Sequence, residues 1–378
     1  MRWSIFICGA GLLCLGAWVD NMRGPLIPAV TEILDLSYQE AALTISLGNL
    51  VAMFSTWLLM PILNRKPLKN VGLGVLIYTT LICACACLAT TKIKLFLWGA
   101  LLGGCISTMG SLSNLFVQSG AEDGRRGQMM SALHSIYGLS SFFAPWVAGV
   151  ALSEPQRWPW LFMAASPVAL GLAIFLQIKI KEPMNDESQT QEPQPMSLES
   201  LHVLAIIVLV SYVLGEVLIS TWLPSYLVKE HQLSIRDASF YTSMFFATMF
   251  VSRVACGIWS TPRWHRVIIW GSILVSLVCF TLGRLTGWLW LLPLAGLLGP
   301  FFPLYVTWVS LRFPDRDRSL IIWMLSLMQA ALAVSNFMMG RLADYVGFNL
   351  AFWLPVVTML CTVLSLKILE NRDRHALI

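Results

Sequence analysis

Charged residues are scarce in this sequence. Lys, Arg, Asp and Glu make up 12% of the 378 residues, hydrophobic residues make up 57%, and the mean hydropathy is +0.71. A soluble domain normally carries about twice this share of charge. The composition therefore excludes an ordinary soluble domain and indicates a protein whose solvent is lipid. The net charge of +5 requires no nucleic-acid partner, because attraction to an anionic membrane surface accounts for it.

The sequence also lacks the patterns that mark catalytic and metal sites. It contains no H-E-x-x-H, no G-x-S-x-G and no paired Cys/His set. Nine cysteines are present, all within apolar runs, and three of them form the stretch "CACAC" at 83–87. On a helix Cys85 would point away from Cys83 and Cys87, so we expect small buried side chains and no disulfide framework. We expect no enzymatic activity, no metal and no cofactor other than a coupling ion.

Long apolar runs dominate what is present. A helix crosses a bilayer with about 20 mostly apolar residues, and these runs are too long and too uniform for barrel strands. The sequence therefore predicts an all-α membrane protein with twelve transmembrane helices, at 3–29, 38–62, 70–91, 94–118, 128–151, 158–179, 201–229, 237–261, 265–285, 288–312, 319–341 and 348–369.

The distribution of basic residues predicts the orientation in the membrane. The first run has no small-residue cleavage site, so it is interpreted as a membrane helix and not as a secretory signal. If both termini lie on one side, that side collects 16 Lys and Arg residues and the other side collects 8. By the positive-inside rule, both termini are expected in the cytoplasm of a multi-pass protein of the cell inner membrane.

The sequence predicts that the chain consists of two related halves. The polar segment 181–200 is rich in Pro, Gln, Glu and Ser and is predicted to be a cytoplasmic linker. It separates an N-terminal six-helix bundle, residues 1–180, from a C-terminal one, residues 201–378. The segment from Pro28 aligns with that from Pro224, and "ALLGG" from Ala100 aligns with "GLLGP" from Gly296, both at a shift of 196 residues. The constant shift predicts two pseudo-symmetric bundles.

Two acids occupy matching places in these halves. Asp20 lies within the first run, about 25 Å along a helix from Trp3, and the 196-residue shift places it on Glu216. A charge inside a bilayer is unfavourable unless it faces a partner or a water-filled cavity. We therefore predict that both acids face a cavity between the bundles.

The whole chain resembles the major facilitator superfamily, with six plus six helices, a central linker and a two-fold repeat. Its loop pattern between the second and third helices is reduced here to "MPILNRKPLK". Within the superfamily, "YVLGEVLISTWLPSYL", "SMFFATMFVSRVACG", "SALHSIYGLSSFFAPWVAG" and "DNMRGPLIP" resemble segments of the fucose:proton symporter-like sugar transporters. The resemblance implies alternating access, with proton or sodium coupling. Arg23 and the degraded loop depart from the pattern.

Several interpretations of the charged residues stay open. Asp20 could form only a local ion pair with Arg23, three residues on, and Glu216 could be a buried carboxyl group bonded to a neighbour. Alternatively, Glu216 carries a proton, because a carboxyl group shielded from water binds protons more readily. Arg23 could keep Asp20 ionised or bind a substrate carboxylate. His134 is either a second proton site or a packing residue.

The remaining predicted site residues fall into two groups. Polar residues at helical spacing favour a cavity lining, although packing of small polar residues between helices is the alternative for Ser and Thr. Expected in the substrate or coupling site are Asp20, Glu216, Arg23, Asn49, Asn114, His134, Tyr212, Trp222, Gln329 and Asn336, and expected at a cytoplasmic gate are Arg65, Lys69 and Arg253.

These observations predict a secondary transporter for a small polar, sugar-like solute, functional as a monomer in the bilayer. An exporter or antiporter of a drug, siderophore or other metabolite is the main alternative, since a lining rich in Met and aromatic residues suits amphipathic molecules. A membrane enzyme lacks its motifs, and a sensor would carry a soluble domain that the short linker does not provide.

Overall fold

The computed structural model describes residues 3–121, 126–180, 199–313 and 317–372, and all regular structure in these segments is helical. The first half contains α1 (Trp3–Asn21), α2 (Arg23–Ile33), α3 (Tyr38–Leu63), α4 (Leu68–Ala84), η1 (Cys85–Leu88), α5 (Lys92–Gly120), α6 (Arg126–Ala151), η3 (Pro155–Arg157), α7 (Trp158–Met163) and α8 (Ala165–Lys179). The second half contains α9 (Ser200–His231), α10 (Ile235–Trp259), η5 (Pro262–Trp264), α11 (His265–Thr286), α12 (Leu291–Leu294), η6 (Ala295–Leu298), α13 (Phe301–Arg312), α14 (Asp317–Val346), α15 (Phe348–Ala351) and α16 (Leu354–Arg372).

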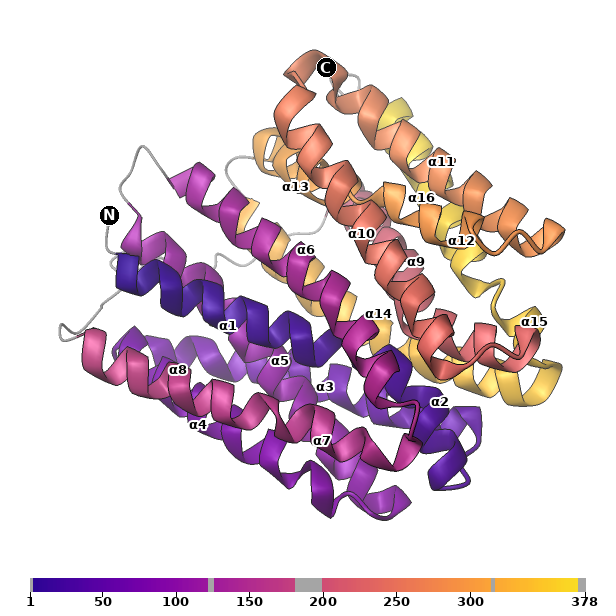
Figure 1. Cartoon of the computed structure of the whole chain (residues 1–378). Helices are drawn as coiled ribbons and strands as arrows, with labels where there is room; N and C mark the ends of the chain where they lie inside the picture. The colour runs from indigo at the N-terminus through magenta and orange to yellow at the C-terminus, as the bar shows by residue number, and fades with distance from the viewer. Residues whose placement is uncertain (1–2, 122–125, 181–198, 314–316, 373–378) are drawn as a thin grey trace.

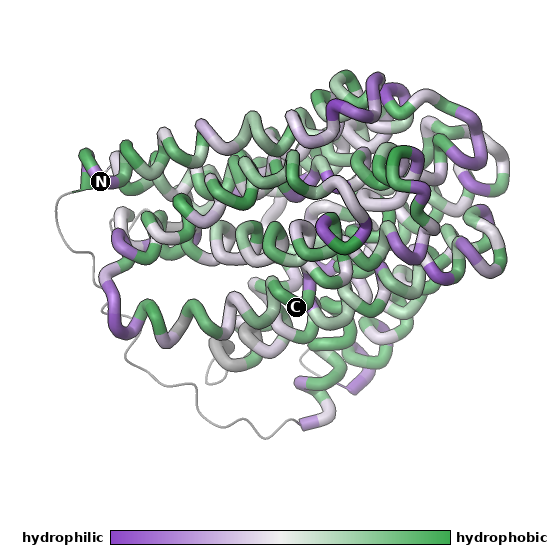
Figure 2. The backbone as a smooth tube through the Cα atoms, turned by 90° about the horizontal axis from the view of Figure 1, so that it is seen from below, coloured by the Kyte–Doolittle hydropathy of each residue, from purple (hydrophilic) through white to green (hydrophobic). Residues whose placement is uncertain are grey.

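The helices match the twelve predicted membrane crossings. Among the described residues, ten helical segments are long and apolar enough to span a bilayer, and α6 and α14, of 26 and 30 residues, complete the twelve. Figure 2 shows the helices as mainly hydrophobic, with the hydrophilic segments lying mostly toward helix ends and connections. The fold class predicted from the sequence is confirmed.

The two halves lie side by side. Figure 1 shows the indigo-to-magenta first half and the salmon-to-yellow second half as adjacent groups of helices. They meet mainly where α14 packs on α3, where α10 packs on α6 and where α2 packs on α9. The predicted linker, except for its last two residues, falls outside the described residues, so the exact division between the bundles stays a prediction.

Several predicted crossings are interrupted. The run 3–29 is divided at Met22, the run 158–179 at Ala164, the run 288–312 at η6 and residues 299–300, and the run 348–369 at residues 352–353, while the run 70–91 changes to η1 at Cys85. The first interruption has a clear cause in Pro25, which has no N–H to donate to the carbonyl of Asn21. Met22 nevertheless keeps near-helical dihedrals, φ −74° and ψ −17°. The irregular turn leaves Asp20, Asn21 and Arg23 at the middle of the molecule.

One end of the molecule is closed by contacts between the halves. At this end, opposite the one where α1 begins and α16 finishes, the carboxylate of Asp344 on α14 accepts hydrogen bonds from the backbone N–H groups of Tyr38 and Gln39, at 2.9 and 2.8 Å. It thereby satisfies two free donors at the start of α3. The crossings α3–α14 and α6–α10 are both so close at Gly340 and Gly149 that a Cβ there would overlap the facing helix. We name this the sealed end, and the other the terminal end.

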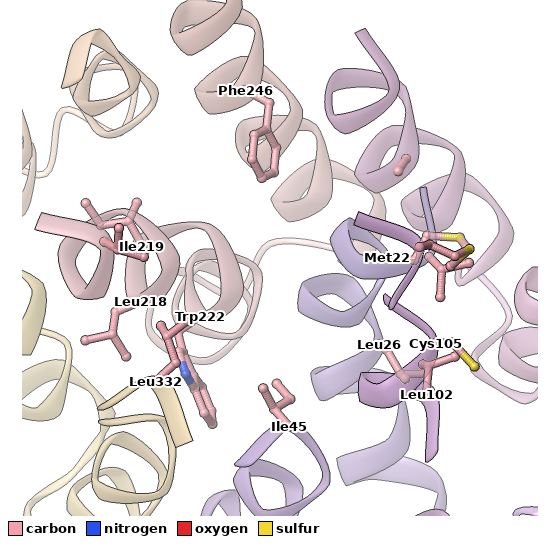
Figure 3. Close-up of a cluster of buried hydrophobic side chains, with 14 of the residues drawn as sticks. Met22, Leu26, Ile45, Leu102, Cys105, Leu218, Ile219, Trp222, Phe246 and Leu332 are labelled. Atoms are coloured by element: carbon pink, nitrogen blue, oxygen red, sulfur yellow. The ribbon is translucent and has the colours of Figure 1, made fainter. Parts of the chain in front are cut away.

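A layer of apolar side chains lies beneath these contacts. Figure 3 shows Ile45 from the first half opposite Trp222 and Leu332 from the second. All three are buried, with exposed fractions of 4%, 0% and 6%. Hydrocarbon packing therefore separates the sealed end from the interior.

Candidate functional site

A cavity lies between the halves beneath the apolar layer. Its inner part has a volume of about 100 Å³ and its wider part, which extends toward the terminal end, about 400 Å³. The two parts are continuous, because Asp20, Tyr137, Glu216 and Gln329 line both. One polar space is thus lined by six helices. They are the irregular end of α1, the middle of α9 and the facing sides of α3, α5, α6 and α14.

The first acid is held by a neighbour in its own turn. The guanidinium of Arg23 forms an ion pair with the carboxylate of Asp20, and Arg23 Nε also donates to the backbone oxygen of Asp20 at 3.3 Å. The side chains retain 17% and 29% of their exposure, for Arg23 and Asp20 respectively, so both remain in contact with the cavity. The local ion pair considered from the sequence is present, and it lies in the cavity wall.

The second acid is held by other parts of the second half. Tyr212, one turn before it on α9, donates its hydroxyl to Glu216 Oε2 at 2.6 Å. Arg253 on α10 places an Nη atom 3.8 Å from Glu216 Oε1, while its Nε donates to the backbone oxygen of Gly299 at 2.9 Å. Arg253 therefore engages Glu216 at the limit of an ion pair and is anchored elsewhere.

Uncharged polar groups line the space between these pairs. Asn49 and Gln329 face the inner part, and Asn114 and His134 face the wider part. Asn114 Nδ2 donates to the oxygen of Gly110 at 3.1 Å, but its Oδ1 is buried and has no donor among the described residues. A buried acceptor without a partner is unfavourable unless water or a ligand supplies the hydrogen bond.

Three predicted site residues lie behind the cavity wall. Trp222 is fully buried and donates its indole N–H to Asn336 Oδ1 at 2.9 Å, and Asn336 Nδ2 donates to the oxygen of Leu332 at 2.9 Å. Tyr212 is also fully buried, with its ring stacked on Phe301 at a centroid distance of 4.4 Å. In this conformation none of the three lines the cavity.

The predicted gate residues are dispersed. Arg253 lies beside Glu216 in the cavity wall and not among the loops of the terminal end, because the α10 helix carries it toward the middle of the molecule. Arg65 is exposed at the terminal end, and Lys69 donates to the oxygen of Gln177 within its own half, at 3.2 Å. In this conformation Arg65, Lys69 and Arg253 do not form one cluster.

Sequence reasoning missed several lining residues. Asn21 donates to Ser141 Oγ on α6 at 3.0 Å, and Tyr137 lines both parts of the cavity. Ser220 and Thr221 line the inner part. Tyr137 carried a usable signal, since it follows His134 by three residues and therefore shares its helix face.

Pro224 leaves one backbone oxygen of α9 without its helical donor. Pro224, the residue aligned with Pro28, has no N–H for the oxygen of Ser220. This oxygen lies where α2 approaches α9, near Gly24. The α9 helix continues through Pro224 without a break, from Ser200 to His231.

Comparison with known proteins identifies the family. A sequence model described as Major Facilitator Superfamily matches residues 6–299 and 205–377. The chain therefore belongs to the Major Facilitator Superfamily. A comparison with curated proteins finds no significant match.

Solved transporters share the fold at low identity. A D-xylose-proton symporter superposes with a TM-score of 0.78 at 11% identity, covering 96% of this chain and 97% of the other. A nucleoside transporter gives 0.71 at 14% identity, covering 99% of both chains. A bacterial homologue of the iron transporter ferroportin gives 0.68 at 16% identity, covering 98% of this chain and 100% of the other. The chain is a transporter of this superfamily and not an enzyme.

Proposed function

We propose that this secondary transporter carries a small, neutral, sugar-like solute and that its transport is coupled to protons. The observation that carries the proposal is the composition of the cavity wall. It contains two carboxylates, each accompanied by an arginine, with amide and hydroxyl groups between them. Because each carboxylate has a cationic partner, the wall favours a solute with many hydrogen-bonding groups and no net charge.

The orientation follows from the basic residues. The terminal end carries the two-fold excess of Lys and Arg, so we place it in the cytoplasm of a cell inner membrane. The cavity widens toward this end and is closed at the other, which corresponds to an inward-open state. Alternating access then requires the two bundles to rock about the cavity, and one chain contains a complete pathway.

Glu216 is the acid whose charge we expect to change. When it is ionised, it accepts the Tyr212 hydrogen bond and attracts Arg253 across the gap of 3.8 Å. When it is protonated, the attraction for Arg253 ends, and the relation between α9 and α10 changes. A proton can thereby bias which state of the transporter is populated, because the two charge states favour different arrangements of these helices.

Asp20 and Arg23 are assigned to solute binding in this proposal. Their ion pair is contained within one helical turn, so it does not depend on how the bundles are arranged. Both groups keep part of their exposure toward the cavity, where a carboxylate accepts and a guanidinium donates hydrogen bonds to hydroxyl groups. The likeness of several segments to fucose:proton symporter-like transporters agrees with a polyhydroxylated solute.

A two-step experiment tests the proposal. A thermal-shift screen of the purified chain against D-xylose, L-fucose, uridine, glycine and a siderophore first identifies a stabilising solute, at two pH values with and without sodium. Proteoliposomes are then tested for proton uptake driven by that solute. We expect Glu216→Gln to abolish proton uptake, and Glu230→Gln, an exposed acid on the same helix, to leave it unchanged. Proton uptake retained in Glu216→Gln would remove this acid from coupling.

A second candidate is an exporter of amphipathic molecules. It is favoured by the apolar residues Met53, Phe302, Leu325 and Met328 in the wider part of the cavity. Uptake into everted vesicles, but not into right-side-out vesicles, would support this candidate over import. Stabilisation by a siderophore or drug, and not by a sugar, would do the same.

A further inference from the structure

A large groove lies on the outer side of the second half, away from the central cavity. It has a volume of about 750 Å³ and runs along α10 beside η6 and the start of α11. Its walls include Val251, Trp259 and Trp264, which are 63%, 76% and 48% exposed. Because α10 is a membrane-spanning segment, this groove faces the hydrocarbon part of the bilayer.

The groove offers almost no hydrogen-bonding groups. The hydroxyl groups of Thr248 and Ser252 already donate hydrogen bonds within α10. Thr248 donates to the backbone oxygen of Met244 at 2.8 Å, and Ser252 donates to that of Met249 at 2.9 Å. The rest of the wall is apolar, apart from Ser260 at its end. A hydrocarbon chain satisfies such a surface, whereas a polar molecule would lose its hydrogen bonds to water.

One end of the groove carries a positive charge. There the connection between α10 and α11 places the exposed Arg263 guanidinium 5.8 Å from the ring centroid of Trp264. The neighbouring Arg266 is neutralised by Glu370, at 3.0 and 3.2 Å. No described carboxylate forms an ion pair with Arg263. A phosphate group is the anion that this depth of a bilayer supplies, and tryptophan favours the same interfacial level.

We propose that the groove binds one acyl chain of an anionic phospholipid, whose phosphate lies on Arg263. Charge complementarity selects this occupant. Arg263 extends the apolar groove to a cation at the membrane surface, and arginine is suited to phosphate. The proposal does not depend on the identity of the transported solute.

The groove shares its wall with the support of the central site. Ser252 and Pro300 line it, while the adjacent residues, Arg253 and Gly299, form the 2.9 Å hydrogen bond that anchors the arginine beside Glu216. A lipid chain packed on Pro300 and Ser252 therefore supports the segment that positions Arg253. We expect the lipid to stabilise the whole chain and not only a surface loop.

The first test measures lipid binding to the delipidated full-length chain by native mass spectrometry. Dioleoyl phosphatidylglycerol is compared with dioleoyl phosphatidylcholine. One favourable interaction of about 1 kcal/mol between an arginine and an anionic lipid corresponds to about fivefold tighter binding. We expect Arg263→Gln to abolish this preference. Arg236→Gln, an exposed arginine at the other end of α10, should keep it. Equal binding of both lipids to the unmodified chain would overturn the proposal, as would a preference retained in Arg263→Gln.

A second test locates the acyl chain. Ala255→Phe fills the groove and should lower retention of both lipids, whereas Val278→Phe, at a lipid-facing position of α11 outside the groove, should not. Phosphatidylglycerol with a photoreactive acyl chain should label peptides from residues 244–268. Labelling spread evenly over the lipid-facing helices would contradict a specific site, even if the chain binds phosphatidylglycerol.

Discussion

Asp20 and Glu216 occupy matching positions of the two halves but are held in different ways. Asp20 is paired with Arg23 within one turn, whereas Glu216 has a hydrogen bond from Tyr212 on its own helix and a distant arginine on another helix. A pair within one turn moves as a unit. A pair across two helices changes whenever those helices move. The two matching positions therefore differ in how far their contacts depend on the arrangement of the helices.

The largest expected effect comes from breaking the ion pair between Asp20 and Arg23. Asp20→Asn leaves the guanidinium of Arg23 largely buried and without its carboxylate, which should lower the free energy of unfolding by about 2 kcal/mol. We also expect loss of solute binding. Thermal denaturation and solute-induced thermal shifts of the purified protein measure both.

A double variant separates folding from binding at this pair. Asp20→Asn combined with Arg23→Gln removes both charges, so stability should largely recover while solute binding does not. Recovery of neither would indicate a more complex structural role. Full recovery of both would exclude the pair from the solute site.

The pair of Glu216 and Arg253 should respond less in stability and more in transport. Arg253→Gln removes the guanidinium that lies 3.8 Å from Glu216 and is anchored on Gly299, so Glu216 loses the cation that relates it to α10. We expect solute-driven proton uptake to fall by about tenfold, which corresponds to about 1.4 kcal/mol. Unchanged proton uptake in proteoliposomes would mean that Arg253 does not act on Glu216.

Tyr212→Phe should act in the same direction with a smaller effect. The substitution keeps the ring that stacks on Phe301 but removes the hydroxyl that donates to Glu216 at 2.6 Å. Loss of one hydrogen bond of about 1 kcal/mol should lower solute-driven proton uptake about fivefold. Unchanged uptake in proteoliposomes would show that the hydroxyl does not position Glu216.

The smallest expected effect concerns the sealed end. Asp344→Asn weakens the cap on α3, by about 1 kcal/mol, and should increase the population open at that end. Distances between spin labels at Glu32 and Leu350 measure this opening, after replacement of the exposed cysteines. Asp237→Asn is the matched control, because Asp237 lies at the equivalent start of α10 and accepts a hydrogen bond from Ser234, which belongs to the same half. Equal distance changes in both variants would contradict a role in closure.

Much of this architecture follows from the sequence, because long apolar runs and a constant shift are properties of the chain itself. The runs predicted the crossings, and the shift predicted that Asp20 and Glu216 correspond. Contacts between helices were harder to predict from the sequence. Periodicity identifies residues on one face but not what that face meets, so the Trp222–Asn336 hydrogen bond and the place of Arg253 were not foreseen.

Residues at helix interruptions were the hardest to predict. Asn21 was overlooked because a regular helix gives no reason for two adjacent residues to face the same space. Pro25 alters the turn, and both Asp20 and Asn21 then line the inner part of the cavity. The amide of Asn21 reaches α6 from there. Propensity indicates where a helix is interrupted, but tertiary packing decides where the freed residues point.

The two close crossings at Gly149 and Gly340 bear on how fast the sealed end can separate. Gly340 faces the backbone oxygen of Tyr38 and the methyl group of Ala42, and Gly149 faces the short side chain of Ser239. No long side chain therefore lies between the helices at either point. Separating these helices requires no rotamer change at the glycine, and no long side chain has to be withdrawn from the facing helix. The activation barrier for opening is therefore expected to come from the Asp344 cap and from the apolar layer of Ile45, Trp222 and Leu332. The two glycine crossings should contribute little to this barrier.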